Sequence, residues 1–245
     1  MKVLLLAGTA EARELASKMT EAGIEGVASL AGAVRRPAMQ EMPTRIGGFG
    51  GEAAFARYLE VEGMTAVIDA THPFAARISE RTERVCAERG IPYLQLLRPP
   101  WAPSEGDRWH DVNCEEEVAD LVPTGATVFL ATGRQTLERF EGLAGQEVIA
   151  RQIDPPDGPF PFAGGRFLVG RPPFAVEDEM RLFRKLGVDW LVVKNAGGEP
   201  SRSKLDAARA LGIPVAMIAR PPQPPGDKVE TVQGAMAWLR EIERE

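Results

Sequence analysis

The sequence of 245 residues contains few of the residues that bind metal ions or form disulfides. Its two cysteines, Cys86 and Cys114, cannot supply a site of four thiolates, and only two histidines, His72 and His110, accompany them. We therefore expect no bound metal. Reduced cysteines are usual in a reducing compartment, so we also expect a cytoplasmic protein.

Long apolar runs and an excess of positive charge are missing as well. No stretch approaches the roughly 20 apolar residues of a membrane-spanning helix, and the run after Met1 is too short for a signal peptide. With 29 basic and 35 acidic residues, the net charge is −6. This charge disfavours nucleic-acid and membrane-surface partners, because both need an excess of lysine and arginine.

What the sequence does contain is an alternation of short apolar runs and helical patterns. Its composition, 44% apolar and 26% charged, is that of a globular protein. The alternation predicts an α/β fold with doubly wound, mainly parallel sheets. The expected strands are 3–7, 26–30, 44–46, 66–70, 91–97, 126–130, 147–151, 190–193 and 214–218. The expected helices are one that starts near residue 10 and stops at Gly23, and 53–59, 75–89, 136–140, 176–186, 203–211 and 231–243.

A proline-rich segment interrupts this alternation near the middle of the chain. Three prolines lie between Arg98 and Pro103, where neither a strand nor a helix can continue. We therefore predict a first domain at 1–98, a linker at 99–104 and a second domain at 105–245.

The first candidate site is the turn after the first expected strand. Here a glycine precedes the start of a helix, where backbone N–H groups and the helix dipole can receive a phosphate. The spacing of the dinucleotide fingerprint is incomplete, so an ordinary strand-to-helix turn remains the alternative. The residues concerned are Gly8, Thr9, Ala10 and Glu11.

A second candidate follows the second strand, where an NAD-binding unit carries an acidic residue for the ribose hydroxyl groups. This sequence has Ser29 there, followed by Arg35 and Arg36. A hydroxyl group with two guanidinium groups suits a 2′-phosphate, which favours NADP over NAD. A solvated basic loop is the alternative.

Two further loops follow strands of the first half, at the sheet edge where α/β folds bind ligands. One is glycine-rich and the other includes His72, whose position before a proline favours extended backbone. His72 could equally serve packing or capping. The candidate residues are Gly47, Gly48, Phe49, Thr71, His72, Pro73 and Phe74.

The second half has two comparable turns, each with basic residues. One turn follows a strand and is expected to open a helix, which would also suit an anion. The other follows the strand at 190–193, and both could be generic turns. The candidate residues are Thr132, Gly133, Arg134, Lys194, Asn195, Ser201 and Lys204.

Taken together, these residues resemble the precorrin-6A reductase family of cobalamin biosynthesis, over essentially the whole chain. The most specific segment runs from Asp69 to Ala75. Two small residues, Ala7 and Ala196, stand where glycine and serine are common in the family. The other segments that carry the resemblance are 6–12, 132–134 with Arg151, 194–198 and 204–221.

The resemblance implies two Rossmann-like domains with a ligand cleft between them. It implies that NADPH reduces one double bond of the tetrapyrrole precorrin-6A, adding a hydride and a proton to give precorrin-6B. The cofactor would bind mainly to the first domain, whereas the candidates of the second half would lie on the substrate side. Neighbouring pathway enzymes would exchange intermediates with the protein.

Several alternatives stay open. His72, His110, Tyr58 and Tyr93 are proton donors by residue type only, so we assign no catalytic residue. The substrate could carry cobalt. The chain could also be another NADP-dependent reductase or a dinucleotide sensor, although a sensor would not need the basic turns of the second half.

Overall fold

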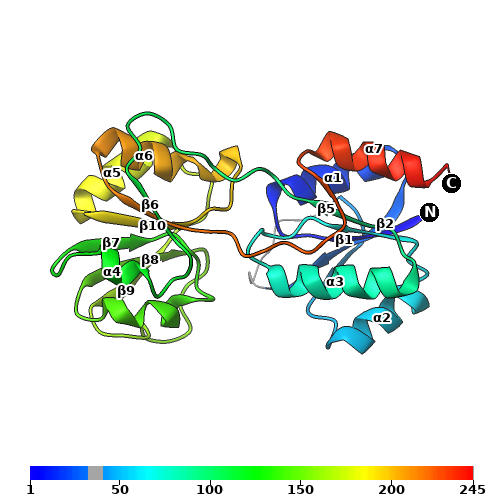
Figure 1. Ribbon diagram of the computed structural model, residues 1–245, viewed down its shortest axis with the longest axis horizontal. Coiled ribbons are helices and arrows are strands. Elements are labelled where there is room, and N and C mark those ends of the chain that lie inside the picture. The colour runs from blue at the N-terminus through cyan, green and yellow to red at the C-terminus, as the bar shows by residue number, and fades with distance from the viewer. Residues whose placement is uncertain (33–40, 245) are drawn as a thin grey trace. The chain divides into compact units, whose positions relative to one another are not determined.

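The computed structural model describes residues 1–32 and 41–244. The chain forms two compact units, each built around its own parallel sheet (Figure 1). The first unit comprises Met1–Pro99 and Pro221–Glu245, and the second comprises Pro100–Arg220. No helix in the described part of the chain is long and apolar enough to cross a membrane.

The sheet of the first unit has six parallel strands in the order β12-β5-β4-β1-β2-β3. The strands are β1 (Lys2–Leu6), β2 (Glu25–Leu30), β3 (Thr44–Ile46), β4 (Ala66–Asp69), β5 (Tyr93–Leu96) and β12 (Asp227–Val229). The helices are α1 (Ala10–Glu21), α2 (Glu52–Val61), α3 (Ala76–Arg89) and α7 (Val232–Ile242).

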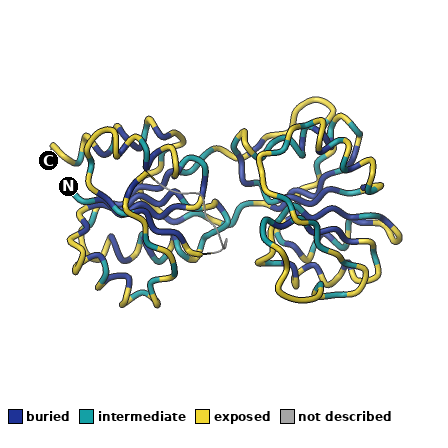
Figure 2. Tube along the Cα trace, turned by 180° about the vertical axis from the view of Figure 1, so that it is seen from behind, coloured by how far each residue is buried: buried dark blue, intermediate teal, exposed yellow. Residues whose placement is uncertain are grey.

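Alternating side chains of the central strand β1 bind both helical layers to this sheet. Val3 and Leu5 pack in the core under α1 and α7, whereas Leu4 and Leu6 pack in the core under α2 and α3. All four side chains are almost completely buried, and Figure 2 shows the strands as the buried centre of each unit. A strand buried on both faces reads as a continuous apolar run, which is why this strand is visible in the sequence.

The sheet of the second unit also has six parallel strands, in the order β6-β11-β10-β7-β8-β9. The strands are β6 (Trp109–Val112), β7 (Thr127–Leu130), β8 (Glu147–Gln152), β9 (Gly165–Val169), β10 (Trp190–Lys194) and β11 (Val215–Ile218). The helices are α4 (Val118–Leu121), α5 (Val176–Leu186), α6 (Ser203–Leu211) and the 3-10 helices η1 (Leu137–Leu143) and η2 (Glu199–Ser201). Figure 1 shows α5 and α6 on one face of this sheet and α4 on the other.

The two sheets share one topology. In each sheet, one edge strand is separated in the sequence from the strand that it pairs with. In the first unit, β12 pairs with β5 after the chain has completed the second unit. In the second unit, β6 precedes all the other strands yet pairs with β11 at the far edge. Both sheets therefore have their switch point at two central neighbours, β1 and β4 in one and β7 and β10 in the other.

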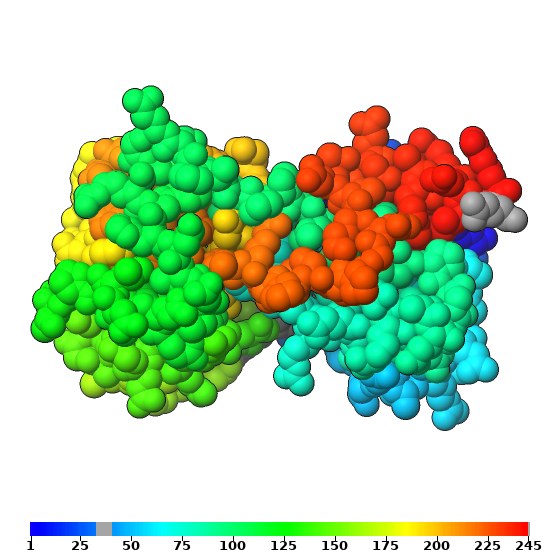
Figure 3. Space-filling model, viewed as in Figure 1, coloured from blue at the N-terminus to red at the C-terminus, as the bar shows by residue number. Residues whose placement is uncertain are grey.

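The prediction that 105–245 forms the second domain is wrong at its C-terminal end. Residues 221–245 belong to the first unit, because β12 extends its sheet and α7 packs on α1 through core residues such as Leu239. Figure 3 shows this C-terminal segment, in orange and red, lying against the cyan atoms of the first unit. The expected linker at 99–104 contains the first crossing between the units, at Pro99–Pro100.

The first crossing is short and its flanking residues are held by their own units. Arg98 forms an ion pair with Glu11 of the first unit, at 2.7 Å. Trp101 of the second unit donates its backbone N–H to Oδ1 of Asn195 and accepts from Nδ2 of the same side chain. Only Pro99–Pro100 lies between these two anchored residues.

The second crossing repeats this arrangement. Arg220 of the second unit donates from Nε to the carbonyl of Asn195, at 2.7 Å. Gln223 of the first unit donates from Nε2 to the carbonyl of Pro73, at 3.0 Å. Again only two prolines, Pro221–Pro222, lie between the anchored residues. All four anchors contact predicted site residues, namely Glu11, Asn195 and Pro73.

Candidate functional site

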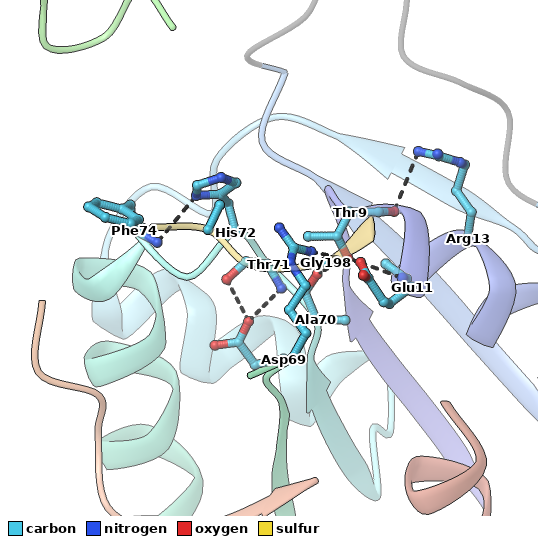
Figure 4. Close-up of polar contacts among 12 residues, drawn as sticks. Thr9, Glu11, Arg13, Asp69, Ala70, Thr71, His72, Phe74 and Gly198 are labelled. Carbon is cyan, nitrogen blue, oxygen red and sulfur yellow. Dashed lines mark hydrogen bonds and ion pairs between the residues drawn. The ribbon is translucent and has the colours of Figure 1, made fainter. Parts of the chain in front are cut away.

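The switch point of the first sheet lies at the carboxyl ends of β1 and β4, and Thr9 joins them. Its Oγ1 accepts the N–H of Ala12 at 3.1 Å, which caps α1, and donates to the carbonyl of Ala70 at 2.9 Å. Figure 4 shows Thr9 beside the segment that follows β4. The structure therefore brings together the turn at Gly8 and the loop at Thr71, which lie far apart in the sequence.

The start of α1 presents its backbone to solvent on this edge. Gly8 is exposed, has a φ of +154°, and has no other atom within 4 Å of the position that a Cβ would occupy. Ala10 and Glu11 are the first two residues of α1. The backbone N–H groups of the first turn of an α-helix have no carbonyl acceptor within the helix. The carboxylate of Glu11 would repel an anion, but its ion pair with Arg98 compensates its charge.

The loop after β4 is shaped by Asp69, which the sequence reasoning did not select as a site residue. This buried carboxylate accepts from the backbone N–H of Thr71 at 3.0 Å and from its hydroxyl group at 2.7 Å (Figure 4). Its second oxygen accepts from the hydroxyl group of Tyr93 at 3.1 Å. Burial and the charge of Asp69 raise the pKa of Tyr93, which stays protonated. An Asp at the end of an apolar strand, two residues before Thr, is the local signal for such a turn.

His72, Pro73 and Phe74 continue this loop toward α3. The His72 side chain is exposed, and its Nδ1 accepts the backbone N–H of Phe74 at 3.3 Å. In the neutral ring, the proton therefore lies on Nε2. The Pro73 side chain is buried, and its carbonyl accepts from Gln223.

Ser29 lies at the end of β2, directly beside the end of β1. It pairs with Leu6 on one side and with Arg45 of β3 on the other. The predicted phosphate contacts Arg35 and Arg36 lie outside the described residues. Within the described residues, Arg45 lies against Ser29, with Nη1 donating to the hydroxyl oxygen at 2.7 Å.

The glycine-rich loop after β3 wraps around Arg45. The carbonyls of Gly47 and Gly48 accept from the Arg45 guanidinium at 2.9 and 3.0 Å. The ring of Phe49 stacks on the same group, 3.9 Å from its central carbon. Sequence reasoning missed Arg45 because a charged residue in a three-residue strand resembles a solvated edge position.

In the second unit, the turn after β7 does not open an α-helix as expected. The helical segment that follows is the 3-10 helix η1, which starts only at Leu137. Thr132 nevertheless has a buried hydroxyl oxygen that finds no hydrogen-bond partner in the described part of the chain. Gly133 has a φ of +77°, and the exposed Arg134 lies 3.4 Å from the carboxylate of Asp157.

Lys194, at the end of β10, has a buried carboxylate partner. Its Nζ lies 3.1 Å from Oε1 of Glu115 and donates to the hydroxyl oxygen of Thr136 at 3.0 Å. Burial acts to raise the pKa of Glu115, but Lys194, together with hydrogen bonds from the Glu115 backbone and the Thr136 side chain, lowers the pKa overall. Arg139 contacts the same carboxylate at 2.7 Å. The charge of Lys194 is therefore already compensated.

The loop that follows β10 is held from inside the second unit. Asn195 binds the backbone of Trp101, as described above. Lys204 donates to the carbonyl of Ser201, and burial together with the charge of Arg151 lowers the pKa of Lys204 to about 8. Arg151 itself forms two 2.7 Å hydrogen bonds with the buried carboxylate of Glu179.

The residues considered as proton donors lie in different surroundings. Tyr93 is buried against Asp69, and burial raises the pKa of Tyr58. His110 lies on the edge strand β6, with its ring 5.2 Å from that of Trp190. Only His72 is both exposed and at the switch-point edge of its sheet.

Comparisons with known proteins agree over nearly the full chain. The family model described as Precorrin-6x reductase CbiJ/CobK matches residues 2–240. The precorrin-6A reductase of Rhodococcus erythropolis is 45% identical and covers 99% of both chains. That of Rhodobacter capsulatus is 43% identical, over 97% of this chain and 95% of the relative.

A solved structure named CobK precorrin-6A reductase superposes with a TM-score of 0.94 at 42% identity, over 98% of this chain and 96% of that chain. Relatives named cobalt-precorrin-6A reductase are more distant, at 26–29% identity.

Proposed function

Because the chain belongs to the precorrin-6x reductase CbiJ/CobK family, we propose that the first unit binds the reducing cofactor and the second the substrate. The activity is that of an oxidoreductase of cobalamin biosynthesis, which reduces precorrin-6A. The observation that carries this assignment is the match of 45% identity over almost the entire chain. The fold agrees with it, because the chain superposes over 98% of its length on the solved structure named CobK precorrin-6A reductase.

We propose NADPH as the cofactor, with its phosphates at the start of α1. Three features support this position: the open backbone at Gly8, the N–H groups of Ala10 and Glu11 in the first turn of α1, and the compensation of the Glu11 charge by Arg98. A serine rather than an acid at the end of β2 supports a phosphorylated ribose, because a carboxylate there would repel a 2′-phosphate.

The cofactor supplies the hydride, so the chain has to orient and enclose the reactants. Thr9 and Asp69 do this indirectly, since they fix the two loops at the switch point in one arrangement. Thr71, His72 and Phe74 are the side chains of that loop that we place beside the cofactor. The source of the proton stays unassigned.

For the second unit, we propose that the edge around Thr132 binds the tetrapyrrole. The hydroxyl group of Thr132, which has no hydrogen-bond partner among the described residues, is the group that we place against a carboxylate of the macrocycle. Arg134 is exposed beside it, and its ion pair with Asp157 lies at the surface. Lys194, Asn195 and Lys204 then act mainly by shaping the neighbouring loop, because their polar groups already have partners.

We propose the cobalt-free macrocycle as the natural substrate, because the relatives at 40–45% identity are named for it. We also retain the cytoplasm as the proposed location. Both cysteines are free, which suits a reducing compartment.

The experiment is a reductase assay with purified protein and four substrate pairs. Precorrin-6A or its cobalt form is mixed with NADPH or NADH carrying deuterium at the transferred position, and the product is analysed by mass spectrometry. We expect fastest turnover with precorrin-6A and NADPH, and one deuterium in the product. Faster turnover with the cobalt form would refute the substrate, and faster turnover with NADH would refute the cofactor.

A further inference from the structure

Arg45 occupies a defined place relative to the proposed nucleotide site. Leu6, Ser29 and Arg45 lie side by side on the adjacent strands β1, β2 and β3. In a doubly wound fold, the phosphates lie at the start of the first helix and the adenosine ribose lies over the end of the second strand. Arg45 is therefore one strand beyond the position of the ribose.

The contacts of Arg45 with other described residues fix its guanidinium, and none of them is with a carboxylate. Its three hydrogen bonds go to the hydroxyl oxygen of Ser29 and to the carbonyls of Gly47 and Gly48, all of which are neutral acceptors. Two of the five N–H donors of an arginine remain without a partner among the described residues. Ser29 accepts in this bond, so its own hydroxyl proton stays available for an anion.

The surroundings of Arg45 add positive rather than negative charge. Arg81 of α3 lies on the same aromatic ring, with its central carbon 5.8 Å from the centroid of Phe49. Two nitrogens of Arg81, Nε and Nη2, are buried and have no hydrogen-bond partner among residues 1–32 and 41–244. The nearby carboxylate of Glu52 on α2 is bound by Arg84 instead. Within the described residues, no carboxylate forms an ion pair with Arg45.

We propose that Arg45, together with the hydroxyl group of Ser29, binds the 2′-phosphate and selects NADPH over NADH. The inference rests on the proposed cofactor and names the residue that discriminates. A phosphate can use the two remaining donors of the guanidinium and the Ser29 proton without breaking any existing contact. Arg81, which lies near the same Phe49 ring, adds a second positive charge to this neighbourhood.

The test measures binding rather than turnover, by titration calorimetry with NADP⁺, NAD⁺ and 2′,5′-ADP in the absence of substrate. We expect Arg45→Ala to weaken NADP⁺ and 2′,5′-ADP by about 10- to 100-fold, the range of a lost hydrogen bond to a charged group. Its affinity for NAD⁺ should change less than about twofold, since NAD⁺ lacks the group that Arg45 contacts. Arg45→Lys should lie between the wild type and the alanine variant, because it keeps the charge but not the paired donors.

The matched control is Arg57→Ala, which removes an exposed arginine from α2 of the same unit. It should leave all three affinities unchanged. If the wild type prefers NADP⁺ and Arg45→Ala keeps the same preference, the role of Arg45 is refuted while the proposed cofactor stands. Equal losses for NADP⁺ and NAD⁺ would show that Arg45 only supports the fold. A wild type that prefers NAD⁺ would overturn both proposals.

Discussion

Replacing Thr9 by valine tests whether one hydroxyl group holds the two loops of the switch point together. The change keeps the branched shape of the side chain but removes Oγ1. Two contacts are lost, the cap on the N–H of Ala12 and the bond to the carbonyl of Ala70. Thr9→Ser keeps both contacts and is the matched control.

The expected magnitude follows from the two lost contacts. Loss of a threonine cap costs about 1 kcal/mol of stability, and an unsatisfied buried carbonyl costs about 1–3 kcal/mol. One atom makes both contacts, so we expect a combined loss of about 2–3 kcal/mol rather than the full sum. Thr9→Ser should lose less than about 1 kcal/mol.

Urea unfolding followed by hydrogen exchange on peptides from each unit measures this effect. Only the first unit should lose stability in Thr9→Val, so the second unit serves as an internal control. The affinity for NADP⁺ should also fall several-fold, because the turn at Gly8 loses its tie to the loop at Thr71. A first unit within about 0.5 kcal/mol of the wild type would refute the bridging role. If Thr9→Ser is as unstable as Thr9→Val, the lost stability does not come from the hydroxyl contacts.

Three further predictions concern buried charges. Glu115→Gln should destabilise the second unit by about 3 kcal/mol in urea, because it leaves a buried lysine without its carboxylate. The matched control Glu116→Gln removes an exposed carboxylate and should destabilise the unit far less. The pKa of Lys204 is about 8 in the folded protein and 10.5 in the unfolded chain, so the folded state releases its proton first as the pH rises. The free energy of unfolding of the wild type should therefore increase relative to that of Lys204→Met between pH 8 and pH 10.5. A free-energy difference between the two proteins that does not change over this range would contradict the burial of Lys204. Asp69→Asn should raise the KM for NADPH more than Tyr93→Phe does, because Asp69 binds both Thr71 and Tyr93, whereas Tyr93→Phe removes only the second of these contacts. Equal KM values for the two variants would show that the contact with Thr71 does not affect cofactor binding.

The central strands of both sheets could be predicted from the sequence, whereas three edge strands could not. A strand such as β10 is buried on both faces and shows a continuous apolar run. The edge strands β6, β9 and β12 are partly exposed and carry charged residues such as Asp111 and Lys228, so their pattern is that of a loop. Nothing local in β12 states which sheet it joins. Its pairing with β5 depends on contacts between residues more than 100 positions apart, and the domain boundary was wrong for that reason.

In the candidate site, too, features that depend on the local sequence could be predicted, whereas contacts between distant residues could not. The turns at Thr9 and Thr132 were predictable, since a parallel strand that ends before a helix or loop places its next residues at the ligand edge. Whether a cation at that edge is available could not be predicted, because the sequence shows a charge but not its partner. Lys194 follows a buried strand and meets the buried carboxylate of Glu115.

This difference in partners separates structural cations from cations that can bind an anion. A lysine such as Lys194 would have to share or give up its carboxylate to bind a phosphate or a substrate carboxylate, at the cost of a buried unpaired charge. An arginine such as Arg45 is held by a hydroxyl oxygen and two carbonyls, so its position is fixed while its charge remains available. The rigid support also lowers the entropy that an anion must offset on binding, because the side chain is already ordered. By this criterion, Arg45 is better prepared for an anionic ligand than Lys194.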